Sequence, residues 1–141
     1  MAYWLFKTEP GDYSWDQFVA DGRTEWDGVK NHQAANNMRA MKLGDRAFFY
    51  RSVKDPAVLG IMTVVTAAYP DPDDPKGKFV RVDLEPVEPL PEPVPLAAIK
   101  AEPDLADIAL VRQSRLSVMP VREAHWRRIC AMGGLEADGE P

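Results

Sequence analysis

The chain has 141 residues, 45% of them hydrophobic, which fits a single domain with a core of its own and excludes wholesale disorder. Its 17 basic and 22 acidic side chains give a net charge of −5, which disfavours a protein that coats nucleic acid regardless of sequence. One cysteine and two histidines exclude an internal disulfide and are too few for a typical structural zinc site.

No segment of the chain predicts a leader, an anchor or a cofactor site. The N-terminal apolar stretch, residues 2–6, is too short for the core of a signal peptide. No run of about 18 apolar residues is present, so we expect no membrane contact and a cytoplasmic protein. We expect one domain over residues 1–132 and a frayed tail over residues 133–141. No Gly-rich phosphate loop indicates a nucleotide cofactor, and the oligomeric state is left open.

Strands and short helices are predicted in alternation from the N-terminus. Residues 2–7 are rich in aromatic side chains and predict a buried first strand. Ser14 and Gln17 have a capping-box spacing, which predicts a helix that ends near residue 20. Asn31 is a candidate N-cap for a second helix. The inner face of that helix is predicted from a periodic apolar stripe, Ala34, Met38 and Met41.

The middle of the chain predicts a sheet. Residues 46–51 and 60–68 have apolar side chains on both faces and predict central strands. Residues 69–78 predict an exposed loop, and residues 79–84 alternate in the manner of a further strand. Five prolines within residues 86–95 predict an extended connection rather than a strand.

Short helical turns are predicted over residues 96–100 and 103–109, followed by a last strand near residues 117–119. Pro120 suits the first turn of a final helix. The buried face of that helix is predicted to hold Trp126, Ile129 and Cys130. Together these elements predict an α+β fold, a mixed β-barrel of about five to six strands with short surrounding helices.

A locally basic segment is one candidate for contact with nucleic acid. Residues 30–54 contain six basic side chains and one acidic side chain, a net charge of +5 within an acidic protein. A positive face of this kind suits a phosphate backbone, although a solvated helix face and charged strand ends explain the pattern equally simply. The basic residues are Lys30, Arg39, Lys42, Arg46, Arg51 and Lys54.

An aromatic ring and several amides lie just before and within this segment. Trp26 stands in a turn-rich stretch, where an indole can stack on a base; the alternative is that it covers the core. Asn31, Asn36 and Asn37 follow, and an amide can read the edge of a base. The alternatives are helix capping for Asn31 and simple solvation for one of the other two.

Polar side chains at strand ends predict a pocket. Lys7 and Glu9 share one face of the first strand if it continues, and Tyr50 and Ser52 share a face where a later strand leaves the core. Such groups line the mouths of barrels, although Lys7 and Glu9 could also form a simple salt bridge. Residues 110–117 add arginine, glutamine and serine side chains suited to phosphate or base contacts, or to ordinary loop decoration.

Signals for catalysis are weak. Cys130 falls on the apolar face of the final helix, which predicts a buried structural thiol. His125 lies five residues before Cys130, the wrong spacing for a shared helical face, and His32 is the only other histidine.

Several motifs resemble those of the EVE domain family. Residues 3–10, YWLFKTEP, resemble its opening motif, and residues 26–31, WDGVKN, resemble a second one. Gly44-Asp45 followed by Phe49-Tyr50, and residues 110–118, also fit. The resemblance runs in order over about residues 2–130.

This resemblance implies a PUA-like barrel related to the YTH domains. It implies a reader that holds a flipped modified base, such as 5-methylcytosine or its oxidised forms, and leaves DNA or RNA open. It implies an aromatic wall from Trp26 and a base-binding pocket completed by Lys7, Glu9, Asn31, Tyr50 and Ser52. It further implies rim or backbone contacts from Lys30, Arg39, Arg51, Gln113 and Arg115.

Two other functions compete with the reader. The related ASCH domains include amidohydrolases of modified nucleosides, and Lys7, Thr8 and Glu9 would then supply base, nucleophile and acid. Thr8 is expected to point away from the other two on a regular strand, which argues against this mechanism. A scaffold for a protein partner would instead expose an apolar patch.

Overall fold

Six strands form one mixed sheet in the computed structural model, which describes residues 1–8, 13–27, 29 and 31–135. The order across the sheet is β2-β5-β4-β3-β1-β6, with β1 and β3 parallel and every other neighbouring pair antiparallel. The expected α+β fold with about six strands is confirmed, but β2 and β6 do not pair, so the sheet is open within the described residues. The strands are β1 (Tyr3–Thr8), β2 (Thr24–Trp26), β3 (Arg46–Arg51), β4 (Ala57–Pro70), β5 (Val80–Pro95) and β6 (Val118–Val121).

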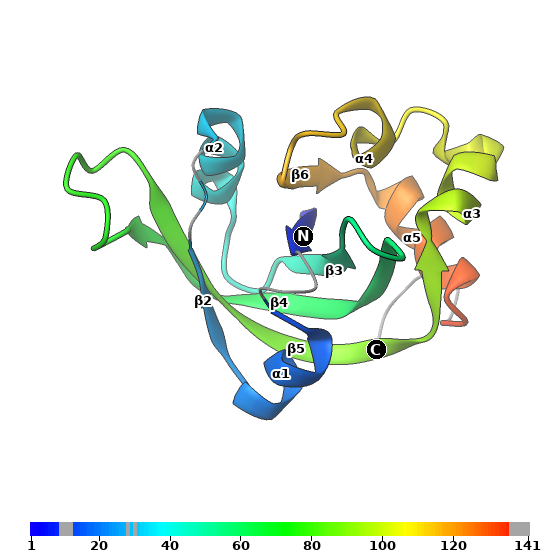
Figure 1. Cartoon of the computed structure of the whole chain (residues 1–141), viewed down its shortest axis with the longest axis horizontal. Helices are drawn as coiled ribbons and strands as arrows, with labels where there is room; N and C mark the ends of the chain where they lie inside the picture. The colour runs from blue at the N-terminus through cyan, green and yellow to red at the C-terminus, as the bar shows by residue number, and fades with distance from the viewer. Residues whose placement is uncertain (9–12, 28, 30, 136–141) are drawn as a thin grey trace.

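Short helices lie around the sheet. Figure 1 shows β4 and β5 running the length of the molecule, with α2 above one end and α3, α4 and α5 around the other. None of the helices in the described part of the chain is long and apolar enough to cross a membrane. The helices are α1 (Trp15–Asp21), α2 (His32–Ala40), α3 (Leu96–Ala101), the 3-10 helix η1 (Pro103–Leu105), α4 (Ala109–Arg112) and α5 (Glu123–Met132).

Both predicted helix caps are present. The Ser14 hydroxyl accepts a hydrogen bond from the Gln17 backbone N–H at 3.0 Å and begins α1. The Asn31 side chain accepts from the Ala34 N–H at 2.9 Å and begins α2. Each cap satisfies one backbone donor that the first helical turn leaves without a partner.

The core lies between the sheet and the helices. Trp126 of α5 stacks on Phe48 of β3, with ring centroids 3.9 Å apart, and on Tyr3 of β1 at 4.5 Å. Ile129 and Cys130 are fully buried beside it, which confirms the predicted inner face of the final helix and the buried thiol.

The predicted start of the final helix is wrong. Pro120 lies inside β6, opposite Trp4, and α5 begins at Glu123. Since β6 is an edge strand, a residue without an N–H is tolerated there, and the proline signal for a helix start is misleading.

The proline-rich stretch is a strand and not a free connection. β5 continues to Pro95 and remains antiparallel to β4 through Pro86, Pro89 and Pro95. Beyond Leu84 this strand has β4 as its only neighbouring strand among the described residues, so proline nitrogens can face an edge without a strand ladder. The strand β2, which carries Trp26, is not predicted from the sequence. Its three residues are too few to show an alternating pattern.

The segment between β4 and β5 is also more ordered than expected. Tyr69 and Pro70 belong to β4, and Asp71 is buried. The Asp74 carboxylate accepts hydrogen bonds from the backbone N–H groups of Lys76, Lys78 and Phe79 at 3.1, 2.7 and 2.8 Å. Aspartates that bind their own backbone account for a defined turn where polarity alone predicts a loose loop.

Candidate functional site

A cavity of about 500 Å³ opens where the parallel strands β1 and β3 end. We call it the Lys7 cavity. It brings together four of the predicted site residues, Lys7, Tyr50, Ser52 and Arg115, against apolar walls that include Leu96 and Leu110. Residues from both ends of the chain therefore meet in one place.

Strand register explains why these side chains meet. Lys7 lies directly opposite Tyr50 in the β1–β3 pair, so both point to the same face. Beyond the ladder, the backbone N–H and the hydroxyl of Ser52 both donate to the Thr8 carbonyl, at 2.8 and 3.1 Å. Ser117 binds the other side of β1 by accepting from the Lys7 N–H at 2.9 Å.

The Lys7 ammonium is partly withdrawn from water. Its Nζ donates to the Ser114 carbonyl oxygen at 2.8 Å. Burial lowers the pKa of Lys7 because the charged form is less well solvated in the cavity. Burial also raises the pKa of Tyr50 to about 12, so its hydroxyl stays protonated at neutral pH.

A polar cleft of about 360 Å³ adjoins the Lys7 cavity. Ser114 and Arg115 line both, so the two lie side by side. Gln113 also lines the cleft and accepts a hydrogen bond from the Gln33 side chain at 3.0 Å, which links α2 to the segment before β6. Asn31 also lines the cleft. Its side-chain carbonyl oxygen caps α2, which confirms the alternative interpretation of this residue as a helix cap.

Trp26 lies on the other face of β1 and β3. Its ring meets Phe6 edge-on at 5.1 Å and Phe49 at 6.0 Å between centroids. Because neighbouring residues on a strand point to opposite faces, Lys7 and Tyr50 point away from it. The indole thus packs on the core while staying partly exposed. Two predicted site residues, Glu9 and Lys30, lie outside the described residues.

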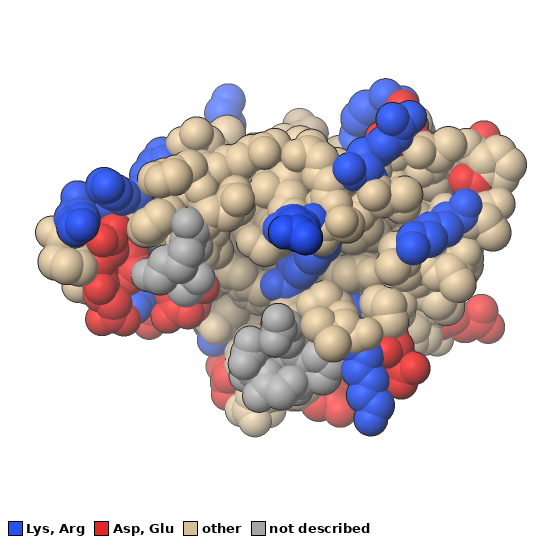
Figure 2. Space-filling model, turned by 45° about the horizontal axis from the view of Figure 1, so that its top comes forward, with Lys and Arg blue, Asp and Glu red and all other residues tan. Residues whose placement is uncertain are grey.

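Two predicted rim residues are engaged elsewhere. Arg39 binds the Asn36 side chain at 2.7 Å and the carbonyl of Lys78. Arg51 donates twice to the Asp55 carbonyl, at 3.0 and 2.8 Å, and does not line the Lys7 cavity or the cleft. Figure 2 shows Lys and Arg side chains scattered across this face, from its left end through its centre to its right side, while Asp and Glu side chains gather mainly at its left end and lower edge.

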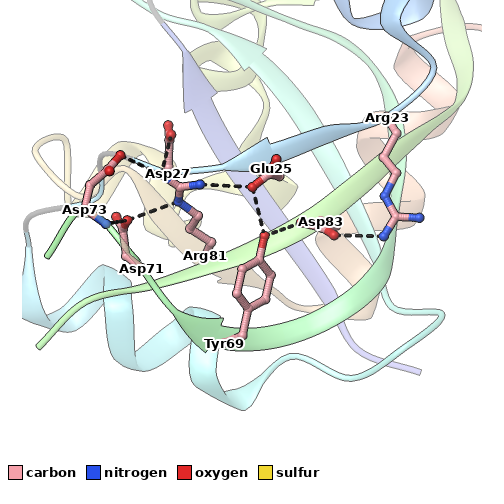
Figure 3. Close-up of polar contacts among 8 residues, drawn as sticks. All are labelled: Arg23, Glu25, Asp27, Tyr69, Asp71, Asp73, Arg81 and Asp83. Carbon is pink, nitrogen blue, oxygen red and sulfur yellow. Dashed lines mark hydrogen bonds and ion pairs between the residues drawn. The ribbon is translucent and has the colours of Figure 1, made fainter. Parts of the chain in front are cut away.

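An arginine that the sequence does not single out joins β2 to its surroundings (Figure 3). The Arg81 guanidinium contacts two carboxylates that flank Trp26, those of Glu25 at 2.9 Å and Asp27 at 3.4 Å. It also contacts Asp71 at 3.1 Å and Asp73 at 2.7 Å in the β4–β5 turn. This single side chain therefore holds β2 against β5. Its partners are too distant in sequence for a local pattern to reveal them.

A second network reinforces the same edge of the sheet. Arg23 pairs with Asp83 at 2.8 Å, and the Tyr69 hydroxyl donates to the same carboxylate at 2.6 Å. Burial disfavours the ionised form of Asp83, but hydrogen bonds from Tyr69, Arg23 and Thr66 outweigh this and hold its pKa below the ordinary value.

Comparison with known proteins identifies one family and several relatives of this chain. The model of the EVE domain family matches residues 2–132. Human thymocyte nuclear protein 1 is 33% identical over 156 aligned residues, which cover 86% of this chain and 69% of that protein.

Solved structures share the same fold. A protein from Rhodopseudomonas palustris superposes with a TM-score of 0.91 at 53% identity, covering 95% of this chain and 94% of the other. The crystal structure of human THYN1 in complex with DNA that contains 5-methylcytosine superposes with a TM-score of 0.88 at 30% identity, covering 96% of this chain and 99% of the other.

Proposed function

The chain belongs to the EVE domain family, and on this basis we propose that it binds nucleic acid and holds a modified base, such as 5-methylcytosine or one of its oxidised forms. The observation that carries the proposal is the human THYN1 structure with DNA that contains 5-methylcytosine, because it matches this chain over nearly its whole length. The polar cleft and the Lys7 cavity support it, since they place amides, hydroxyls and cations on one surface.

The recognised nucleotide would leave the base stack to reach the site. In this proposal, Trp26 offers the aromatic surface on which the base stacks. Asn31 offers a polar contact, and Gln113 and Arg115 contact the rim of the base or its backbone. Lys7 and Ser52 lie on the opposite face of β1 and β3 from Trp26, so they contact a part of the nucleic acid that does not stack on the indole. Because Asn31 uses its carbonyl oxygen as a cap, the amide NH₂ is the group that it offers to a base.

Binding of labelled oligonucleotides tests the proposal. The oligonucleotides carry cytosine, 5-methylcytosine, 5-hydroxymethylcytosine or methylated adenine at one position and are otherwise identical. We expect tighter binding of one modified base, and we expect Trp26→Ala to remove the preference while Trp26→Phe retains part of it. Loss of one stacked base costs about 1–3 kcal/mol, which corresponds to about 5- to 150-fold in affinity. Equal affinity for all four oligonucleotides would contradict the proposal for this set of bases.

The mass of the bound nucleotide after incubation separates a reader from an enzyme. A reader leaves the mass unchanged, whereas an amidohydrolase changes it. The geometry gives little support to Thr8 as a nucleophile beside Lys7. Its hydroxyl donates to the Tyr13 carbonyl at 3.2 Å, and its side chain is buried on the opposite face of β1.

A further inference from the structure

Lys7, like Arg46 and Arg51, is partly buried without a carboxylate partner among the described residues, in contrast to several other cations. Arg81 contacts four carboxylates, Arg23 contacts Asp83 and Glu85, and Arg128 contacts Glu102 at 2.6 Å. In the described part of the chain, the Lys7 ammonium donates to the Ser114 carbonyl, which is neutral. Burial of a positive charge is costly, and among the described residues no carboxylate offsets that cost for Lys7, so an anionic ligand in the cavity would be stabilised by it.

Arg115 adds a second cation to the same cavity. It is exposed, it lines both the Lys7 cavity and the cleft, and it forms no ion pair with any described carboxylate. The described lining of the Lys7 cavity contains no aspartate or glutamate. The cavity therefore combines two cations with serine hydroxyls and apolar walls, an arrangement that favours an anionic group over a neutral one.

We propose that the Lys7 cavity is an anion subsite, in which Lys7 and Arg115 together bind the anionic oxygens of the nucleotide. This inference rests on the proposed function for the nature of the ligand. An ammonium has three donors, and the Ser114 carbonyl uses one of them, so two remain for ligand oxygens. The apolar walls strengthen the attraction because they lower the local dielectric constant.

Two groups of a modified nucleic acid present such oxygens. One is a backbone phosphodiester beside the recognised base, and the other is a carboxylate on a fully oxidised 5-methylcytosine. Both would bring negative charge to the same two cations. The lowered pKa of Lys7 agrees with this role, because binding of an anion would return it toward its ordinary value.

Inorganic phosphate is the probe for the first test. The full chain, with lysine side chains labelled for NMR, is titrated with phosphate at constant ionic strength. We expect a saturable change in the Lys7 signal and a rise in its pKa. Lys42 provides the internal control, because it lies near the start of β1, where Asp45 binds both the Ala2 and the Lys42 N–H groups. At 3.3 Å per residue, this is on the order of 15 Å from Lys7. A Lys7 signal that changes no more than that of Lys42 would overturn the subsite.

Matched variants provide the second test, with the oligonucleotide that binds best. We expect Lys7→Met to weaken binding about tenfold and to reduce the slope of log K against log salt concentration by about 1, with partial rescue in Lys7→Arg. Lys76→Met, at an exposed lysine of the β4–β5 turn outside the basic segment 30–54, is the matched control and should change neither quantity. Weaker binding of Lys7→Met with an unchanged salt slope would show that Lys7 contacts no anion, and it would overturn the proposal.

Ligand chemistry then distinguishes the two sources. A neutral methylphosphonate at one linkage should reproduce the effect of Lys7→Met if the subsite takes a backbone phosphate. A 5-carboxyl group should instead raise affinity only when Lys7 is present if it takes a base carboxylate. If neither the methylphosphonate nor the 5-carboxyl group has the expected effect, the subsite is overturned, even if modified bases are preferred. A Lys7 response to phosphate without any preference for modified bases would leave the subsite standing and contradict the proposed function.

Discussion

Gly60 of β4 lies directly beneath the indole of Trp15. An added Cβ would come within 2.6 Å of Cζ2 of that ring, and the ring is itself packed against Phe18 at 5.6 Å and Phe49 at 5.3 Å between centroids. These two rings hold the indole over Gly60, so it must tilt away from them toward its partly open side to accept the added carbon. We expect Gly60→Ala to lower the free energy of unfolding by about 1–3 kcal/mol, as overpacking does in other cores.

Urea unfolding of three variants checks this expectation. If the clash is the cause, Trp15→Leu alone should be destabilising, and the double variant Gly60→Ala/Trp15→Leu should lose less than the sum of the two single changes. Simple additivity, or an unchanged midpoint for Gly60→Ala, would contradict the packing argument.

The strand β2 shows how an element of three residues is held in place. It forms a short ladder with β5, and the ion pairs of Arg81 and Arg23 anchor it on both sides of Trp26. Because the backbone ladder is so short, side-chain charges contribute a large share of its attachment. The position of Trp26 therefore depends on the ion pairs that Arg81 and Arg23 make beside it.

Acid should weaken this edge of the sheet. The pKa of Asp83 lies below the ordinary aspartate value in the folded protein, so its ionised form stabilises the fold above that value. This contribution is lost as the pH falls through the folded-state pKa. We expect the thermal midpoint to drop between about pH 5 and pH 2, and we expect Asp83→Asn to flatten the drop. Identical pH profiles for both proteins would contradict this assignment.

At the scale of the whole molecule, local signals predict more than distant contacts do. Ser14 and Asn31 are recognised as caps because their partners lie three residues away. Lys7, Tyr50 and Ser52 are predicted to line a pocket because alternation along each strand needs no knowledge of the fold. Arg81 is missed because Glu25 lies 56 residues away, and only the β2–β5 pairing brings the two together.

The open sheet has the same physical origin. Closure depends on whether the first and last strands of the order meet, and β2 and β6 are separated by four strands. Alternating apolar residues specify that a segment is a strand, but they do not specify its neighbours. The number of strands could therefore be predicted from the sequence, whereas their arrangement required the structure.

The net charge of −5 predicts how binding responds to salt. Broad phosphate contact is unfavourable for an acidic protein, and the proposed subsite supplies two cations, Lys7 and Arg115. One phosphodiester bound by both cations corresponds to a slope of about −1 in log K against log salt concentration. The ratio of affinities for modified and unmodified oligonucleotides should stay constant across the same salt range, because the phosphate contribution is common to both and cancels. Binding measured at several salt concentrations checks both expectations. A slope steeper than about −5 would indicate a wide electrostatic interface instead of a compact base pocket with one anion subsite.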